Sequence, residues 1–188
     1  MNSALYDAYF KSVKDYLQPI LQTFAATLPV LVGLTAKQKS AVIIAIVYFI
    51  LFLLTSFASQ NAGRINQFFK EQSRGINILF VIGIGLTMVS GMAFHFDLFA
   101  LAIPLFMSLY IVQNVRRPMA VSYISDTIKE NAMATGLSVE SQLKTLFIAV
   151  FAPIVGAIAD LIGVGPAIGI VAAVILFFYP IYKVNPQS

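Results

Sequence analysis

The chain alternates between long apolar runs and short polar connections. Runs of this length do not show the alternation in roughly ten-residue strands that is typical of a membrane β-barrel. Because every backbone N–H and C=O must be bonded internally in hydrocarbon, the runs predict helices. We therefore predict an all-α membrane protein with six transmembrane helices in one domain, residues 1–188. The helices are expected at about residues 17–34, 40–58, 75–94, 98–113, 138–162 and 167–182.

The residues before the first run predict one further short helix. Aromatic and aliphatic residues recur there at three- and four-residue intervals, with lysines between them: Tyr6, Tyr9, Phe10, Val13 and Tyr16. This spacing is typical of an amphipathic helix. We expect it to lie at the membrane surface.

Composition agrees with a membrane protein and narrows the chemistry. Charged residues make up 11% of the chain and mean hydropathy is +0.86, whereas a soluble domain carries about 25% charged residues. The chain has no cysteine and one histidine, which excludes disulfides, thiol catalysis and cysteine-ligated metals. No nucleophile–base pair or metal cluster is recognisable, so we predict no metal, no cofactor and no enzymatic activity.

The basic residues alternate from one connection to the next. Nine of the twelve lie in the N-terminal tail, the second and fourth connections and the C-terminal tail: Lys11, Lys14, Arg64, Lys70, Arg74, Arg116, Arg117, Lys129 and Lys183. The positive-inside rule places these parts, and both termini, in the cytoplasm. Lys37 and Lys39, in the first connection, count against this orientation. The net charge of +4 then reflects topology, so the predicted partner is the lipid bilayer of the plasma (inner) membrane and not nucleic acid.

Two stretches resemble the C-terminal half of a major facilitator superfamily transporter. The first is SFASQNAGRI, residues 56–65, where Gly63 and Arg64 match the cytoplasmic loop motif between the second and third helices of that half. The second covers residues 116–167 and contains ATGLS (134–138) and APIVGAIADLIG (152–163). The resemblance implies two inverted three-helix repeats, with Arg116 and Arg117 in a longer cytoplasmic loop before the fifth helix.

The resemblance also implies a function. It predicts transport of a small-molecule solute by alternating access, with this chain as the C-terminal half of a secondary transporter. A missing N-terminal half or a second copy would then cover its polar cavity face. The alternatives are a non-transporting membrane scaffold or subunit, and an inactive truncated fragment.

Candidate substrate-binding residues lie in the proline-bearing first and fourth helices, which line the cavity in the family. Gln18 and Gln22 share one face, with Pro19 between them predicted to open the helix locally. Polar side chains are costly in lipid unless they are bonded, so these amides line a cavity or bond to a neighbouring helix. Tyr110 is a third candidate substrate contact. The preferred interpretation of Tyr110, Gln113 and Asn114, at the cytoplasmic end of the fourth helix, is that they are anchors at the membrane interface.

Charged residues near the helix ends have two interpretations each. Glu140 and Lys144 are four residues apart and share a helix face, which fits an ion-pair or proton site in the membrane. The preferred interpretation is structural: Ser138 caps the helix, Glu140 complements its dipole and Lys144 reaches the headgroups.

Arg116 and Arg117 have a preferred role in setting topology and contacting anionic lipid. The alternative is a latch to Asp126 or Glu130. Small residues at four-residue spacing, Ala152 with Gly156 and Gly165 with Gly169, are expected to serve helix packing.

Overall fold

The computed structural model describes residues 1–29, 33–128 and 132–185. Within these ranges all regular elements are helical: α1 (Asn2–Val13), the 3-10 turn η1 (Lys14–Tyr16), α2 (Leu17–Thr27), α3 (Ala36–Gln67), α4 (Gln72–His95), α5 (Phe99–Thr127), α6 (Met133–Ile162), α7 (Val164–Phe177) and α8 (Tyr179–Tyr182). Four of the described helices, α3 to α6, are long and apolar enough to cross a membrane; α7 is apolar but has 14 residues. The all-α class is confirmed, and the length and apolarity of these four helices fit a membrane-embedded chain.

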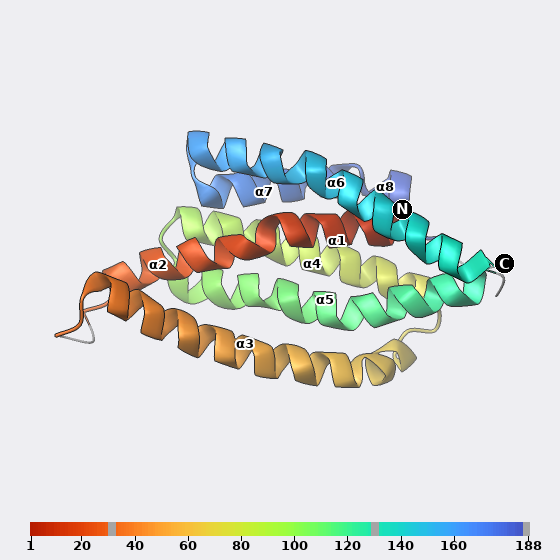
Figure 1. Cartoon of the computed structure of the whole chain (residues 1–188), viewed down its shortest axis with the longest axis horizontal. Coiled ribbons are helices and arrows are strands. Elements are labelled where there is room, and N and C mark those ends of the chain that lie inside the picture. Colours follow the sequence, from red (N-terminus) through yellow and green to blue (C-terminus); the bar gives the residue numbers. More distant parts are fainter. Residues whose placement is uncertain (30–32, 129–131, 186–188) are drawn as a thin grey trace.

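The helices run roughly along one axis in a layered bundle (Figure 1). In this view α6, α7 and α8 lie along one side and α3 along the other, with α1, α4 and α5 between them. α4 packs against α5 and α7, whereas α3 packs against α5 and α2. The two termini lie toward the same end (Figure 1), where the Asn2 amide donates a 3.1 Å hydrogen bond to the Tyr182 carbonyl.

The amphipathic N-terminal helix forms, but the prediction that it lies on the membrane surface is wrong. Tyr6, Tyr9 and Val13 of α1 have no exposed surface and pack with Phe80 of α4 and Leu109 of α5. Gly83 makes room for this contact, because any side chain there would overlap the Tyr6 hydroxyl. The aromatic residues therefore face other helices, and α1 becomes part of the core.

Two prolines shape the first predicted helix. Pro19 has no N–H to donate to the carbonyl of Asp15, and the chain there passes through η1 between α1 and α2. The 3-10 turn ends before Pro19, and α2 continues without a break from Leu17 to Thr27, so the helix is not opened between Gln18 and Gln22 as expected. α2 ends at Thr27, short of the predicted residue 34, because a residue before a proline disfavours helical geometry. Leu28, before Pro29, is extended, with ψ 127°.

The predicted second and fourth connections are mostly helical, so their boundaries are wrong. α3 continues through SQNAGRINQ to Gln67, and α5 continues through RRPMAVSYISDT to Thr127. Both extensions are held by packing: Ala58 and Ala62 of α3 cluster with Met119 and Ala120 of α5. At about 1.5 Å per residue such helices exceed a hydrocarbon layer about 30 Å thick. Their polar ends extend past the apolar runs instead of turning back.

α4 and α7 approach so closely that their backbones touch. A side-chain carbon at Gly91 would lie 2.6 Å from the Gly165 carbonyl, and one at Gly165 would lie 2.6 Å from the Gly91 carbonyl. A carbon at Gly91 would also lie 3.0 Å from the Gly169 nitrogen. The packing role predicted for Gly165 and Gly169 is confirmed. Gly156 has free space around it, with only the Tyr16 hydroxyl at 4.0 Å, so the corresponding prediction for Ala152 and Gly156 is wrong.

Candidate functional site: a charged cavity between α1, α5 and α6

Arg116 is fully buried in the bundle. Its Nη2 donates a 2.5 Å hydrogen bond to Asn2 Oδ1 of α1. The guanidinium carbon lies 4.4 Å from the ring centre of Tyr6 and 5.6 Å from that of Phe80. Arg116 Nε and Nη1 have no hydrogen-bond partner among the described residues. A buried cation costs free energy unless it is paired, and the two rings compensate for part of that cost.

An acid and an amide meet beside this arginine. Gln113 Nε2 of α5 donates a 2.9 Å hydrogen bond to Asp7 Oδ1 of α1, and both side chains are buried. The Gln113 Oε1 acceptor has no partner in the part of the chain that the structure describes. Gln113 and Arg116 are three residues apart on α5, so they share a face.

A cavity of about 190 Å³ opens next to this cluster. Its lining comes from three helices: Asp7, Phe10 and Lys11 of α1, Gln113, Asn114 and Arg117 of α5, and Lys144 of α6. The charged side chains are three cations and one carboxylate. We call this space the charged cavity. Its excess of positive charge and its unpaired amide acceptor suit a small solute that carries negative charge and a hydrogen-bond donor.

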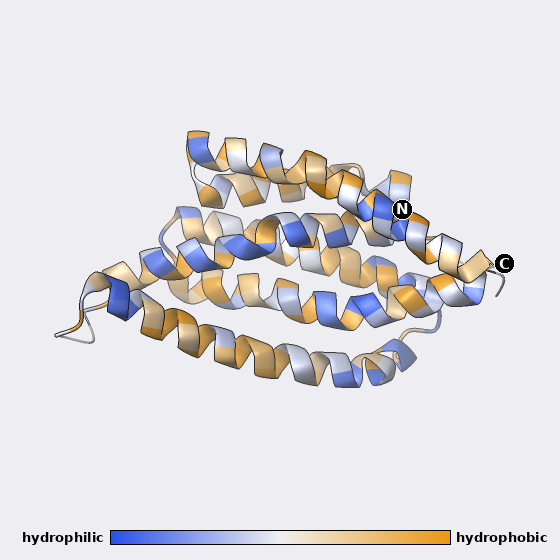
Figure 2. Cartoon of the chain, in the orientation of Figure 1, coloured by the Kyte–Doolittle hydropathy of each residue, from blue (hydrophilic) through white to orange (hydrophobic). Residues whose placement is uncertain are grey.

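The charged cavity lies near the middle of α5 and α6. Gln113 is the central residue of α5 (Phe99–Thr127), and Lys144 lies one turn before the middle of α6 (Met133–Ile162). Both helices are candidate membrane spans. Figure 2 shows hydrophilic residues in α1 and in the second half of α5, between the apolar stretches of the outer helices.

The structure brings two of the three predicted substrate-binding residues together. Gln18 and Gln22 are exposed and line an open hollow of about 630 Å³ beside Lys37 and Ser40 of α3. Neither amide bonds to a neighbouring helix within the described residues. Tyr110 is elsewhere: its hydroxyl donates a 2.6 Å hydrogen bond to the Lys14 carbonyl at η1. It therefore ties α5 to the break in the N-terminal segment.

Glu140 and Lys144 are both half-buried on α6. The predicted capping role of Ser138 is wrong, because α6 begins earlier, at Met133. Among the described residues the two charges do not form an ion pair with each other; the pair within 4.0 Å is Lys14 with Asp15. Lys144 lines the charged cavity, so the structure places it beside the cluster described above.

The predicted cytoplasmic loop residues are separated. Gly63 and Arg64 are exposed on the last turns of α3, not in a loop. Arg116 is buried and Arg117 lines the charged cavity, so the prediction that both lie in a cytoplasmic loop is wrong. Asp126, one predicted latch partner, is exposed and accepts a 3.5 Å hydrogen bond from Ser122. Glu130, the other, lies outside the described residues.

Sequence reasoning missed Asn2, Asp7 and Lys11 as site residues, and it preferred an interfacial role for Gln113. A signal was present in α5, because Leu109, Val112, Arg116 and Met119 continue one helical face past the end of the apolar run. Nothing within α1 marks Asp7 as an interior residue, since its partner Gln113 is 106 positions away. Within the described residues there is no group of three or more His, Cys, Asp or Glu able to hold a metal ion.

Comparison of the chain with models of protein families, with curated proteins and with solved structures finds no match.

Proposed function

We propose that this chain transports a small solute across a membrane by alternating access, as the C-terminal half of a major facilitator-like secondary transporter, with the charged cavity as its solute site. The observation that carries the proposal is the buried charge at the middle of α5: Arg116 has no exposed surface, and Asp7 and Gln113 pair beside it. Ionisable groups inside a membrane bundle are rare and mark substrate or ion pathways.

Stability alone does not account for this cluster. Replacing a buried ionic group by well-packed apolar side chains is often neutral or stabilising. Arg116 leaves two guanidinium nitrogens without partners, and Gln113 leaves one oxygen. Groups left unpaired in a resting bundle are available to a ligand or to a second conformation, and both are needed in a transport cycle.

The depth of the cavity also supports the proposal. A rise of about 1.5 Å per residue puts Gln113 about 21 Å from the start of α5. When α5 enters the membrane at Phe99, that depth lies within a hydrocarbon layer about 30 Å thick. The cavity is smaller than the roughly 300–1,000 Å³ of sites for drug-sized ligands, which favours a small solute.

The pairing of the helices supports inverted three-helix repeats. The two repeats would be α1–α2, α3 and α4, and then α5, α6 and α7–α8. A twofold relation would match α1–α2 with α5, and α3 with α6. The contact of α1 with α6 then corresponds to the contact of α5 with α3, and both contacts are present. The contact of α4 with α7 maps onto itself. Among the described residues, the contact of α4 with α5 has no such counterpart between α7 and α1, so the twofold relation covers part of the helix packing.

A partner half fits the outer helices. α3 exposes Phe49, Phe52 and Phe57, and α6 exposes Leu146 and Leu161, each with more than half of its surface accessible. Lipid or a second six-helix unit, either a missing N-terminal half or another copy, would cover these faces.

The test starts from binding, because the solute is unidentified. The purified chain in detergent is heated with a panel of small carboxylates, phosphates and amines, and its thermal midpoint is recorded. A ligand at about 100 times its Kd adds about 2.7 kcal/mol of stability. We expect anions to stabilise the chain, and Lys144→Gln and Arg117→Gln to remove that gain. Lys39→Gln is the matched control, because Lys39 does not line the cavity.

Flux decides between a transporter and a subunit. The chain is then reconstituted into proteoliposomes, and uptake of the stabilising anion is compared with uptake by the Lys144→Gln variant. Uptake that depends on Lys144 supports the proposal. Binding without uptake, by the chain alone or mixed with a second six-helix half, would instead support a non-transporting subunit. Stabilisation by amines only would contradict the assignment of the cavity.

A further inference from the structure

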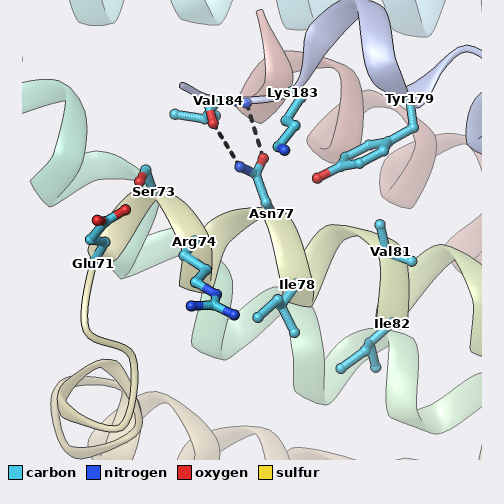
Figure 3. A pocket seen from close by; sticks show the side chains of 10 residues that line it. All are labelled: Glu71, Ser73, Arg74, Asn77, Ile78, Val81, Ile82, Tyr179, Lys183 and Val184. Carbon is cyan, nitrogen blue, oxygen red and sulfur yellow. Dashed lines mark hydrogen bonds between the residues drawn. The ribbon is translucent and has the colours of Figure 1, made fainter. Parts of the chain in front are cut away.

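A second site lies at one end of α4, away from the charged cavity. It is a groove of about 500 Å³ between the first half of α4 and the C-terminal segment from Tyr179 to Val184. Figure 3 shows Arg74, Ile78 and Ile82 projecting from α4, and Lys183 and Tyr179 reaching in from the C-terminal segment.

The C-terminal wall of this groove is held in place by a two-point clamp. Asn77, which is buried, donates through Nδ2 to the Val184 carbonyl at 2.7 Å, and its Oδ1 accepts from the Val184 N–H at 3.0 Å (Figure 3). The Tyr123 hydroxyl donates to the next carbonyl, Asn185, at 3.1 Å. Lys183 is therefore presented at a fixed place beside α4, although the last turn, α8, has only four residues.

The groove has a charged end and an apolar wall. The charged end carries Arg74 and Lys183 with a single carboxylate, Glu71. The apolar wall is formed by Ile78, Val81 and Ile82, which are 37%, 39% and 44% exposed. Arg74, Ile78 and Ile82 follow one another at four-residue spacing, so charge and aliphatic surface lie in line along one face of α4. A ligand that fits both ends is amphiphilic, with an anionic head.

The place of the groove in the bundle identifies the source of such a ligand. α4 is a candidate membrane span, and the groove lies at its start, beside the C-terminal segment. The distribution of basic residues places this end on the cytoplasmic side. Anionic lipids are concentrated in that leaflet, and basic pockets between helices bind their headgroups. A free anion would contact only the charged end and leave three aliphatic side chains uncovered.

We propose that this groove binds a phospholipid with an anionic headgroup from the cytoplasmic leaflet, the phosphate against Arg74 and Lys183 and one acyl chain along Ile78, Val81 and Ile82. The site is independent of the solute cavity and requires only that the bundle sits in a membrane. Because the clamp at Asn77 fixes one wall, a bound lipid would also join the C-terminal segment to α4.

The test compares two lipids with identical acyl chains on the purified chain in detergent. Native mass spectrometry counts phosphatidylglycerol and phosphatidylcholine bound to the wild type, to Arg74→Gln, to Lys183→Gln and to the double variant. One basic residue near a membrane surface contributes about fivefold in affinity. We expect each single variant to weaken phosphatidylglycerol binding about fivefold, and phosphatidylcholine binding much less. Lys70→Gln, an exposed lysine of the preceding connection that does not line the groove, is the matched control.

The apolar wall is tested separately. Ile82→Gln should weaken both lipids, whereas inorganic phosphate added in excess should not displace phosphatidylglycerol. Equal binding of the two lipids by the wild type, or no loss in either single variant, would overturn the proposal. Full displacement by phosphate alone would reassign the groove to a soluble anion. Both singly substituted residues are exposed, so the single variants keep the test valid if the double variant fails to fold.

Discussion

The inner and outer helices of this bundle reverse the usual relation between hydropathy and burial. The most apolar stretches of α3 and α6 have mean hydropathies of 2.7 and 2.3 but are only 17% and 6% buried. Those of α4 and α5 have lower values, 2.0 and 1.4, and are 56% buried. In a water-soluble protein the most apolar residues are the most often buried. Here the outside is more apolar than the inside, as a lipid environment requires.

The buried polar residues show the same difference between the inner and outer helices. Ser90 of α4 donates a 2.7 Å hydrogen bond to the Ala102 carbonyl of α5, and both Ser90 and Thr87 have no exposed surface. The interior is thus joined by hydrogen bonds, close backbone contact and one buried cation. The outer faces rely on their apolar character. Substitutions in the interior and on the outer face test this difference.

The largest effect is expected at the buried cation. Arg116→Ala leaves a void and removes the partner of Asn2, so we expect a loss of about 2–5 kcal/mol in the free energy of unfolding. Arg116→Met fills most of the same space without a charge, so its loss should stay below about 1.5 kcal/mol. Titration with SDS, followed by circular dichroism, measures both. Equal losses in the two variants would mean that the charge itself stabilises the interior.

A smaller effect is expected on the outer face of α3. Phe52 is 65% exposed at the middle of this helix. A lysine at the centre of a membrane helix costs about 2.5–3.5 kcal/mol in insertion free energy, so Phe52→Lys should reduce the fraction of chains that integrate. The readout is the fraction retained in membranes after carbonate extraction.

The control for this substitution is Phe68→Lys. Phe68 is more exposed, at 85%, but lies in the connection after α3. It should integrate normally. If both lysines were tolerated equally, the face of α3 would not lie against lipid.

The backbone contact between α4 and α7 gives a third test. Gly91→Ala puts a methyl group within 2.6 Å of the Gly165 carbonyl, and overpacking of this kind costs about 1–3 kcal/mol. Gly63→Ala is the matched control, because nothing lies within 4 Å of its new carbon. It should gain about 0.5–1 kcal/mol from helix propensity. SDS midpoints that moved together would show that the crossing is not close-packed.

The smallest change in stability is expected for Gln18→Leu combined with Gln22→Leu. Both side chains are exposed and unbonded within the described residues, so the free energy of unfolding should change by less than about 0.5 kcal/mol. Because these amides form polar surface of an open hollow, solute uptake should fall while the amount of protein in the membrane is unchanged. Unaltered uptake would remove the hollow from the transport path and favour a scaffold.

Hydropathy predicted the helical segments well because it reports lipid-facing residues directly. The predicted segment 40–58 lies within α3, where Phe49, Phe52 and Phe57 face outward. The break expected between the predicted helices 138–162 and 167–182 is also present: Gly163 has φ 94°, and Pro166 lies in the first turn of α7. Each of these features is local, so a single segment contains the information needed to find it.

The helix ends and the interior of the bundle were less predictable. A polar residue after an apolar run suggests water, yet Gln113 and Arg116 face α1. Lysines beside aromatic residues suggest a membrane surface, yet Lys11 lines the charged cavity. The hydrogen bonds of Gln113 and Arg116 join residues 106 and 114 positions apart. Periodicity within one segment does not carry such pairings.

The 3-10 turn η1 joins two helices that belong to different neighbours. α1 packs against α6, whereas α2 packs against α3. A rotation of α6 relative to α3 that α1 and α2 follow would therefore be taken up at η1, which is followed by Pro19 in the first turn of α2. The N-terminal segment thus connects the two outer helices through a short 3-10 turn. The Tyr110 hydroxyl, which donates a hydrogen bond to the Lys14 carbonyl, holds this turn against α5.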